Sequence, residues 1–458
     1  MQTHGTTELH FSPTTPQLHP RTIHTVDDAP PAPRIDDLPR EQTLTQHGIT
    51  WTFADPVSAG RFVNGDAYVV GPATVTAISP SPADGRNGSV LNLPPTTDRS
   101  GFDSRAHSNR YDPGLRVDLP CDLVPGDSLV STISVENEGE RTRLLFPSKA
   151  TVSSVGTAVV LTCLSEPAPA DAFRPSYADR DNALYLSRHL RRGSIPSLPR
   201  IASTPPIGDC ARLFQGPWID TVQFGFDAPI DIMPDYGRDV CRAGSIASLL
   251  LMLDFSADEK EPLLQGFVQY GIDLWGIVRS GHPGWPAHGG HGNGRKWPMV
   301  FAGLTLGESD MQSPKSGYPD LKLSEDMQTM YGKGWTGADV VYGGHVGPEG
   351  EARQEGWGPY EHLRPSDWKS TIGEGYRRCC TSVAWVGTAL AARILHAEEV
   401  WDHPPFFDYV DRWMTEDDGP FLPEMEEATL RDFSGLPART AWDPFVDEMW
   451  ETYRHSLP

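Results

Sequence analysis

One short segment, HGGHGNGRKWP at residues 288–298, concentrates side chains that could do chemistry. It places His288 and His291 three positions apart on a glycine-rich stretch. Histidine suits general-base catalysis because its unperturbed pKa lies nearest neutrality. Asn293 can donate to a carboxyl oxygen, and Arg295 can clamp a carboxylate through two parallel hydrogen bonds. The composition predicts an active-site loop, and its alternative is a structural glycine-rich turn with solvated His and Arg side chains.

The same two histidines raise the question of a metal site. His288 and His291 would need a third ligand, and the best candidate is His345 in the sequence YGGHVG. The sequence spacing of His345 does not identify it as that third ligand. The chain also has no CxxC pair of the kind used in structural zinc sites. We therefore predict no metal and no cofactor.

A second group of reactive side chains lies in TIGEGYRRCCTSVAW, residues 371–385. A neighbouring positive charge favours the ionised form of a phenol. Tyr376 can therefore act as an acid, with Arg377 tuning its proton affinity. The alternative is a capped helix start that carries a solvated basic pair.

Aromatic rings alternate with polar groups in QEGWGPYEHLRP, residues 354–365. Such rings suit sugars, whose C–H faces stack on them. Close to the histidine loop, Trp285 stiffens the chain, and Lys296 adds its charge to that of Arg295. The predicted substrate-binding residues are Trp285, Asn293, Arg295, Lys296, Trp357, Tyr360, His362 and Arg377.

The net charge restricts the classes of partner. The 458-residue chain carries 38 basic and 61 acidic residues, a formal charge of −23. Such a surface repels nucleic acid and anionic membranes. The longest apolar runs are too short for a transmembrane helix. The N-terminal residues lack the pattern of a secretory signal, so a cytoplasmic location is the default expectation.

The six cysteines do not form a disulfide framework by their spacing. Cys379 and Cys380 are adjacent, and a bond between neighbours is strained. We expect all six to be free thiols, with Cys121 and Cys163 the only pair to check.

The pattern of residue types changes along the chain and predicts an α+β multidomain fold. Short runs such as ITWTFADP, SLVSTISV and GTAVVLTCL, rich in β-branched residues, indicate strands. A β-sandwich-like domain should precede an α-helical (α/α) toroid-like catalytic domain. The predicted parts are a disordered or extended arm at 1–47, the β-sandwich-like domain at 48–165, a Pro-rich connector at 166–210 and the helical domain at 211–458.

Several sequence signals in the C-terminal half predict where individual helices begin and end. Apolar residues recur at helical spacing over residues 238–255. Ser256 and Glu259 form the pattern of a capping box that opens the next helix. A further helix over 296–307 should end at Gly307.

A β-rich part joined to a helical part with a His, Asn, Arg and Tyr loop set resembles the polysaccharide lyases built on an (α/α) toroid, such as the alginate and heparinase-type lyases. The resemblance covers the architecture of residues 211–456. Those lyases present an Asn–His pair with a Tyr and an Arg, whereas here Asn293 follows the histidines. The order of the two parts is reversed relative to many of those enzymes.

The resemblance implies β-elimination at a uronic acid in a polysaccharide or oligosaccharide. Asn293 and Arg295 would neutralise the C5 carboxylate. His288 or His291 would remove the C5 proton, and Tyr376 would protonate the leaving O4 atom. No sequence feature points to an oligomeric state.

Two alternatives remain, and the second of them belongs to another class of protein. A glycoside hydrolase on a helical toroid needs two carboxylates roughly 5–10 Å apart, for which Asp239, Asp273, Glu361 and Glu374 are available. A non-catalytic carbohydrate-binding protein would use the same long loops and the 13 tryptophans.

Overall fold

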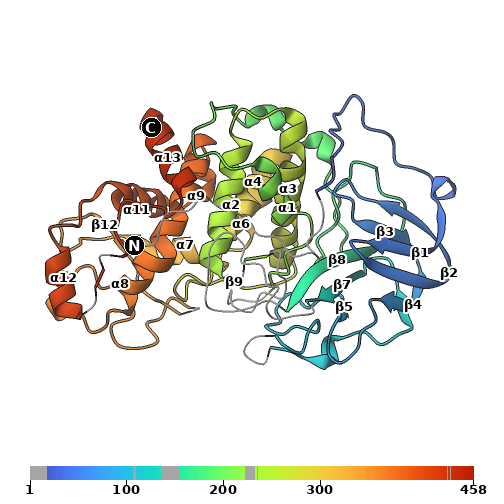
Figure 1. Ribbon diagram of the computed structural model, residues 1–458, viewed down its shortest axis with the longest axis horizontal. Coiled ribbons are helices and arrows are strands. Elements are labelled where there is room, and N and C mark those ends of the chain that lie inside the picture. The colour runs from blue at the N-terminus through green and yellow to red at the C-terminus, as the bar shows by residue number, and fades with distance from the viewer. Residues whose placement is uncertain are drawn as a thin grey trace.

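Eight strands form one sheet that curls on itself at one end of the molecule (Figure 1). Their order across the sheet is β5-β7-β8-β3-β2-β4-β6, and β1 pairs with β2. The pairs are antiparallel except β3 with β8, which is parallel. The strands are β1 Arg40–Gln46, β2 Ile49–Arg61, β3 Ala67–Val70, β4 Ala73–Ser79, β5 Ser89–Leu91, β6 Cys121–Leu123, β7 Ser128–Ser134 and β8 Val155–Leu164.

The computed structural model describes residues 18–106, 110–135, 154–221, 233–234, 236–347, 349–430, 432–433 and 435–457. The first 17 residues of the expected arm lie outside this part. Strand β1 falls within the range 1–47 and belongs to the sheet.

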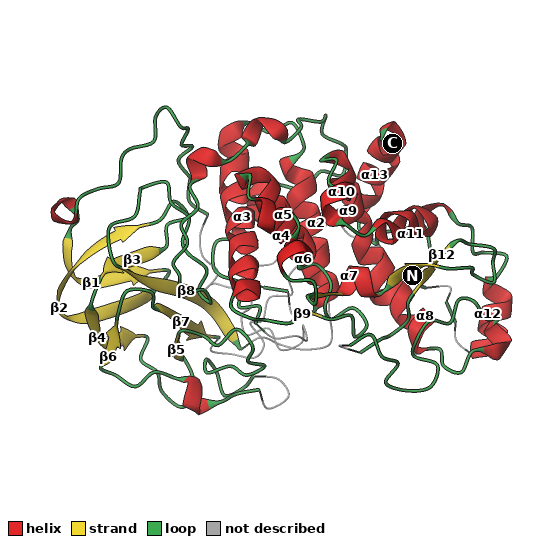
Figure 2. Cartoon of the chain, turned by 180° about the vertical axis from the view of Figure 1, so that it is seen from behind, coloured by secondary structure: helices red, strands yellow, loops and turns green. Residues whose placement is uncertain are grey.

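The α-helices lie beside the sheet in the rest of the molecule, joined by long loops (Figure 2). Helix α2 packs on α9, α3 on α4, and α9 also contacts α11 and α13. The helices are α1 Ile207–Leu213, α2 Gly237–Leu251, α3 Ala257–Arg279, α4 Lys296–Leu306, α5 Ser309–Gln312, α6 Pro314–Gly317, α7 Ser324–Met327, α8 Ile372–Tyr376, α9 Ser382–Ile394, α10 Glu398–Trp401, α11 Pro404–Thr415, α12 Leu422–Thr429 and α13 Pro444–Tyr453. Short strand pairs connect them: β9 Gly284–Trp285 with β10 Lys322–Leu323, and β11 Thr329–Tyr331 with β12 Val340–Tyr342.

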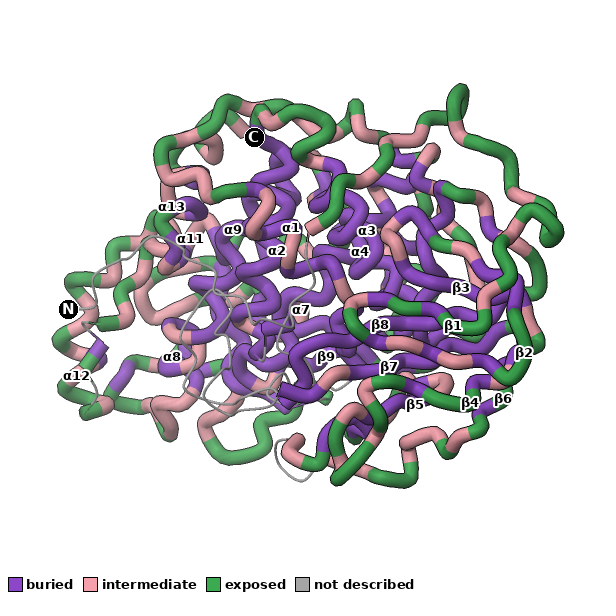
Figure 3. Tube along the Cα trace, turned by 45° about the vertical axis from the view of Figure 1, so that its right-hand side comes forward, coloured by how far each residue is buried: buried purple, intermediate pink, exposed green. Residues whose placement is uncertain are grey.

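The sheet shares an apolar core with the helices. Successive side chains of a strand point to opposite faces, so β7 and β8 serve two clusters at once. Leu129 and Leu161 pack inside the curl of the sheet. Val130 and Val160 belong to the cluster that contains the helix residues. Buried residues of the sheet therefore pack directly against buried residues of the helices (Figure 3).

A buried charge cluster reinforces this junction. Arg174 donates from Nε to Asp66 in the β2–β3 turn and from Nη2 to Asp273 in α3, both at 2.6 Å. All three side chains are buried. Removing one member of such a cluster would leave an uncompensated buried charge.

The predicted fold class, a β-sandwich-like domain followed by a helical toroid, is wrong. The strands form a single curled mixed sheet rather than two facing sheets, because β8 joins β7 to β3. Within the described residues the helices do not form a ring of paired hairpins, since α5, α6, α7 and α10 are only four residues long. The molecule therefore lacks a clear division between a sandwich and a toroid.

Local helix predictions are confirmed. The Ser256 side chain accepts from the Glu259 N–H while the Glu259 carboxylate accepts from the Ser256 N–H, which is the expected capping box of α3. Helix α4 ends at Gly307, which adopts the left-handed conformation with φ 82°. In the part of the chain that the structure describes, none of the helices has the length and apolarity needed to cross a bilayer.

Candidate functional site

The histidine loop between α3 and α4 is tied to the loop that follows β12. The His288 N–H donates to the Val346 carbonyl at 2.9 Å. His288 and Gly289 both have positive φ, at 34° and 69°. This conformation is unfavourable for a residue with a Cβ and persists only where the surroundings impose it. The backbone at His288 is therefore held by its neighbours, as is common at functional sites.

Five aromatic rings from four separate segments meet at this point, and we call them the ring cluster: Tyr236, His288, His291, His345 and Tyr376. The His345 ring stacks on the Tyr376 phenol with centroids 4.4 Å apart. The His288 ring lies 5.1 Å from His345 and 5.3 Å from His291. The His291 ring meets Tyr236 edge-on at 5.0 Å. The structure thus brings the predicted catalytic residues His288, His291 and Tyr376 together, and adds His345 and Tyr236.

The glycines of the loop make this contact possible. A Cβ atom on Gly289 would lie 2.6 Å from the Tyr376 ring and 2.9 Å from the His345 ring. A Cβ atom on Gly290 would lie 2.5 Å from the Cys380 carbonyl oxygen. The absence of a Cβ at Gly289 and Gly290 therefore allows the Tyr376 and His345 rings and the Cys380 backbone to approach the loop closely.

The five rings differ in their access to solvent. His288 and Tyr376 are half-buried, whereas Tyr236, His291 and His345 are buried. A substrate could therefore reach His288 and Tyr376 first. The other three rings are enclosed by the protein.

The three imidazoles are held in the neutral form. Burial lowers the pKa of His291 to about 3 and that of His345 to about 4, and the charges of neighbouring histidines act in the same direction. Burial also lowers the pKa of His288, and the charge of Arg353 lowers it further. Neutral imidazole is the form that accepts a proton.

Arg353 and Trp357 complete the surroundings of the cluster. The Arg353 guanidinium is partly exposed, and its contact with Glu351 is long, at 3.5 Å from Nε to Oε1. Exposed pairs of this kind contribute little free energy, so a substrate carboxylate can compete for Arg353. The predicted binding residue Trp357 is half-buried and packs edge-on against His345 with centroids 4.7 Å apart.

Three residues predicted to bind substrate from the loop are instead bonded inside the protein. Arg295 donates from Nε and Nη2 to both carboxylate oxygens of Asp220 at 2.9 and 2.8 Å. Asn293 donates from Nδ2 to the Cys380 carbonyl at 3.0 Å. The Lys296 Nζ atom lies 2.8 Å from the Asp326 carboxylate. All three are fully buried, which leaves them without a surface for a sugar.

Three other residues predicted to bind substrate, Trp285, Tyr360 and His362, do not belong to the ring cluster. Trp285 is fully buried and donates from Nε1 to the Asp220 carbonyl at 3.1 Å. Tyr360 is buried and its hydroxyl donates to Glu374 Oε2 at 2.6 Å. His362 is exposed to solvent.

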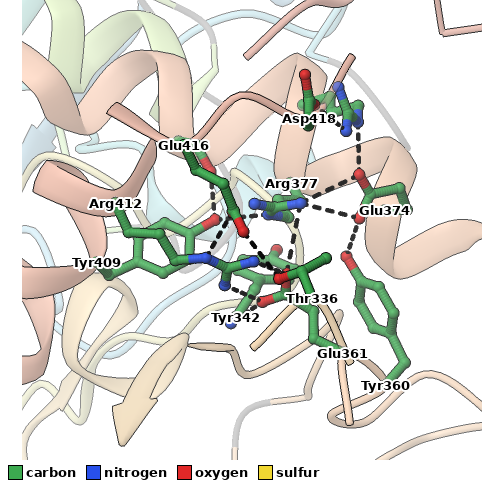
Figure 4. A network of polar contacts seen from close by, with 12 residues as sticks. Thr336, Tyr342, Tyr360, Glu361, Glu374, Arg377, Tyr409, Arg412, Glu416 and Asp418 are labelled. Carbon is green, nitrogen blue, oxygen red and sulfur yellow. Dashed lines mark hydrogen bonds and ion pairs between the residues drawn. The ribbon is translucent and has the colours of Figure 1, made fainter. Parts of the chain in front are cut away.

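Arg377, predicted from sequence to bind substrate and to tune Tyr376, takes part in a buried ionic network (Figure 4). Its Nη1 atom lies 3.2 Å from Glu374 and 3.4 Å from Glu361, and its Nε donates to the Tyr409 hydroxyl at 2.9 Å. Burial would raise the pKa of Glu374, but the charges of Arg377 and Arg378 outweigh it and lower that pKa to about 2. The network fixes the helical turn on both sides of Tyr376.

The prediction that all six cysteines are free is wrong for one pair. Cys379 and Cys380 form a disulfide within the π-helical turn Arg377–Thr381 that follows α8. Cys121 and Cys163, the pair singled out from sequence, are free thiols. The expectation rested on the strain of a bond between neighbouring residues, and the structure nevertheless pairs them.

The three histidines do not by themselves make a metal site. Over the described residues, no group of three or more His, Cys, Asp or Glu side chains has an arrangement that could hold a metal ion.

Sequence reasoning did not include Tyr236 and Arg353 in the site, and considered His345 only as a metal ligand. A signal for His345 was present, because Gly-Gly-His occurs at residues 289–291 and again at 343–345. Tyr236 and Arg353 carry no comparable signal, since only tertiary structure brings them to the loop.

Comparisons with known proteins found no match among family models, curated proteins or solved structures.

Proposed function

We propose that the chain is a polysaccharide lyase that cleaves a uronic-acid-containing glycan by β-elimination. The observation that supports it most is the stack of His345 on Tyr376 beside a neutral, half-buried His288. In support of the proposal, His288 could accept a proton and Tyr376 could donate one, and both are half-buried members of one group of contacting rings. The proposal depends on these side chains and not on a toroid.

The reaction needs three roles, and described residues are available for each. Arg353 binds the C5 carboxylate and stabilises negative charge that develops there. His288 takes the C5 proton, and the released electron pair forms the C4=C5 double bond. Tyr376 gives its phenolic proton to the departing O4 atom. His345 acts through Tyr376, since its stacked ring holds the phenol in place.

The glycoside hydrolase alternative gains little from the four carboxylates that suggested it. Hydrolysis requires one protonated carboxylic acid beside a second carboxylate. Charges of neighbouring arginines overcome the effect of burial and lower the pKa of both Glu361 and Glu374. Burial raises the pKa of Asp273 to about 6, against the opposing charge of Arg174. Asp273 is nevertheless enclosed in its ion pair with Arg174, and Asp239 is buried in an ion pair with Arg238.

A direct assay tests the proposal. Purified protein is incubated with alginate, glucuronan, heparinoid and pectin, and the ultraviolet absorbance of the new C4=C5 double bond is followed. An increase with at least one uronide is the expected result. New reducing ends without this absorbance would indicate a hydrolase. Binding of a glycan without either product would indicate a non-catalytic carbohydrate-binding protein.

The pH dependence of kcat/KM should reveal the lowered pKa of His288. The base must be neutral, and a lower pKa moves its protonation to lower pH. We therefore expect the acid limb of the profile to lie below about 6.5, the ordinary histidine value. Arg353→Gln removes a positive charge that lowers this pKa, so it should move the limb upward.

Arg364→Gln is the matched control for this profile. Arg364 is an exposed arginine that pairs with Glu424 at the surface, and its loss should leave the limb unchanged. A limb at or above the ordinary histidine value in the unaltered protein would argue against His288 as the base.

A further inference from the structure

The Cys379–Cys380 disulfide lies directly beside the ring cluster. It belongs to the turn Arg377–Thr381, which begins at the residue after Tyr376. Cys380 is buried and packs against Gly290 in the histidine loop. The same Gly290 N–H donates to the Tyr236 hydroxyl at 3.2 Å. Because Gly289 lies against the Tyr376 and His345 rings, Cys380 and three rings of the cluster contact the backbone of Gly289 and Gly290.

Both cysteine carbonyls are fixed from outside the turn. The Cys380 carbonyl accepts from Asn293 Nδ2 at 3.0 Å, and the Cys379 carbonyl accepts from Arg238 Nη1 at 3.3 Å. The first bond joins the disulfide turn to the histidine loop, and the second joins it to α2. A change in the turn is therefore transmitted to the elements that carry the cluster.

Access differs between the two sulfur-bearing residues. Cys379 is half-buried, whereas Cys380 is buried, as are the four remaining cysteines. A thiol reagent in solution would thus meet Cys379 before any other cysteine of the chain.

We infer that Cys379–Cys380 is a redox modification site that takes a dithiol reductant and controls the placement of Tyr376. In the oxidised form the cross-linked turn holds the phenol against His345. In the reduced form the two thiols separate, and Cys379, the half-buried member, is the one that moves because Cys380 is buried and its carbonyl is bonded to Asn293. The consequence for catalysis rests on the proposed function, whereas the change in the cluster does not.

The exchange balances with a dithiol as the reductant. One thiolate of the reductant attacks Cys379 Sγ, and the Cys379–Cys380 bond breaks to release the Cys380 thiolate, which takes up a proton. The second thiol of the reductant attacks the mixed disulfide. The Cys379 thiol leaves, and the reductant becomes a disulfide after losing two electrons and two protons.

The redox state of the pair is read by alkylation. The folded protein is treated with iodoacetamide before and after dithiothreitol, and the modified peptides are identified by mass spectrometry. We expect labelling at residues 379 and 380 only after reduction. Labelling of both cysteines without reduction would overturn the inference, since the disulfide would then be absent.

The effect on the cluster is read by the histidine ring resonances of the isotope-labelled protein, with His345 assigned through His345→Gln. Reduction should shift the His345 resonances, because its ring leaves the Tyr376 face. The double variant Cys379→Ser/Cys380→Ser should show the reduced position and ignore dithiothreitol. Unchanged His345 resonances on reduction would also overturn the inference. Neither readout needs turnover, so both remain valid if the lyase assay fails.

Cys121→Ser serves as the matched control, because Cys121 lies in β6 of the sheet. It should keep the full response to the reductant. If the protein is a lyase, reduction should lower kcat by up to about 10²-fold, the loss expected when a catalytic group is displaced by about 1 Å.

Discussion

Tyr376→Phe is expected to lower kcat on a uronide substrate by about 10²- to 10⁴-fold, the contribution of a positioned general acid. The substitution removes only the hydroxyl. The ring remains, so the stack on His345 with its 4.4 Å centroid distance should persist. KM should change little, because Arg353 and Trp357 are untouched. Initial rates from the absorbance of the unsaturated product give both constants.

Tyr331→Phe is the control for this change. Tyr331 is 59% exposed on β11, and its hydroxyl donates to Asp408 at 2.7 Å, apart from the ring cluster. It should retain the full rate. A Tyr376→Phe protein that also retains it would remove the phenol from the mechanism and leave the acid to another group.

The local elements of the C-terminal half were predictable because their signals are local. A capping box needs only Ser256 and Glu259, and a helix stop needs only Gly307. The tertiary arrangement depended on pairings between distant segments. β8 places residues 161–164 beside residues 67–70 of β3 in parallel, and nothing in either run of apolar residues specifies that partner. The β-type runs were thus recognisable, while their assembly into one curled sheet was not.

The candidate site likewise contains residues that could be predicted from the sequence and residues whose roles could not. The HGGHG stretch and Tyr376 were found from residue types, and the structure places them in contact. The roles given to Asn293 and Arg295 rested on side-chain chemistry alone. That chemistry serves a buried backbone carbonyl or a buried aspartate as well as a substrate. Burial decides between these uses, and a single sequence does not reveal it.

Arg295→Met is expected to lower the free energy of unfolding by about 3–5 kcal/mol, the cost of breaking a buried ion pair by removing one partner. The Arg295 side chain is 1% exposed and Asp220 is fully enclosed. Arg295 also donates from Nη1 to the His291 and Asn293 carbonyls at 2.9 and 2.8 Å. Its loss would leave the Asp220 charge uncompensated and release the histidine loop. Urea denaturation followed by tryptophan fluorescence measures the change.

Two further variants separate this structural role from the carboxylate-binding role that the sequence suggested. Asp220→Asn/Arg295→Met removes both charges and should recover part of the lost stability. Arg353→Ala, at the partly exposed guanidinium whose charge acts on His288, should change stability by no more than about 0.5 kcal/mol while raising KM for the uronide. An Arg295→Met protein of full stability with a raised KM would instead place substrate at Arg295. The stability of one arginine variant and the KM of the other therefore decide which guanidinium supports the fold and which one meets the glycan.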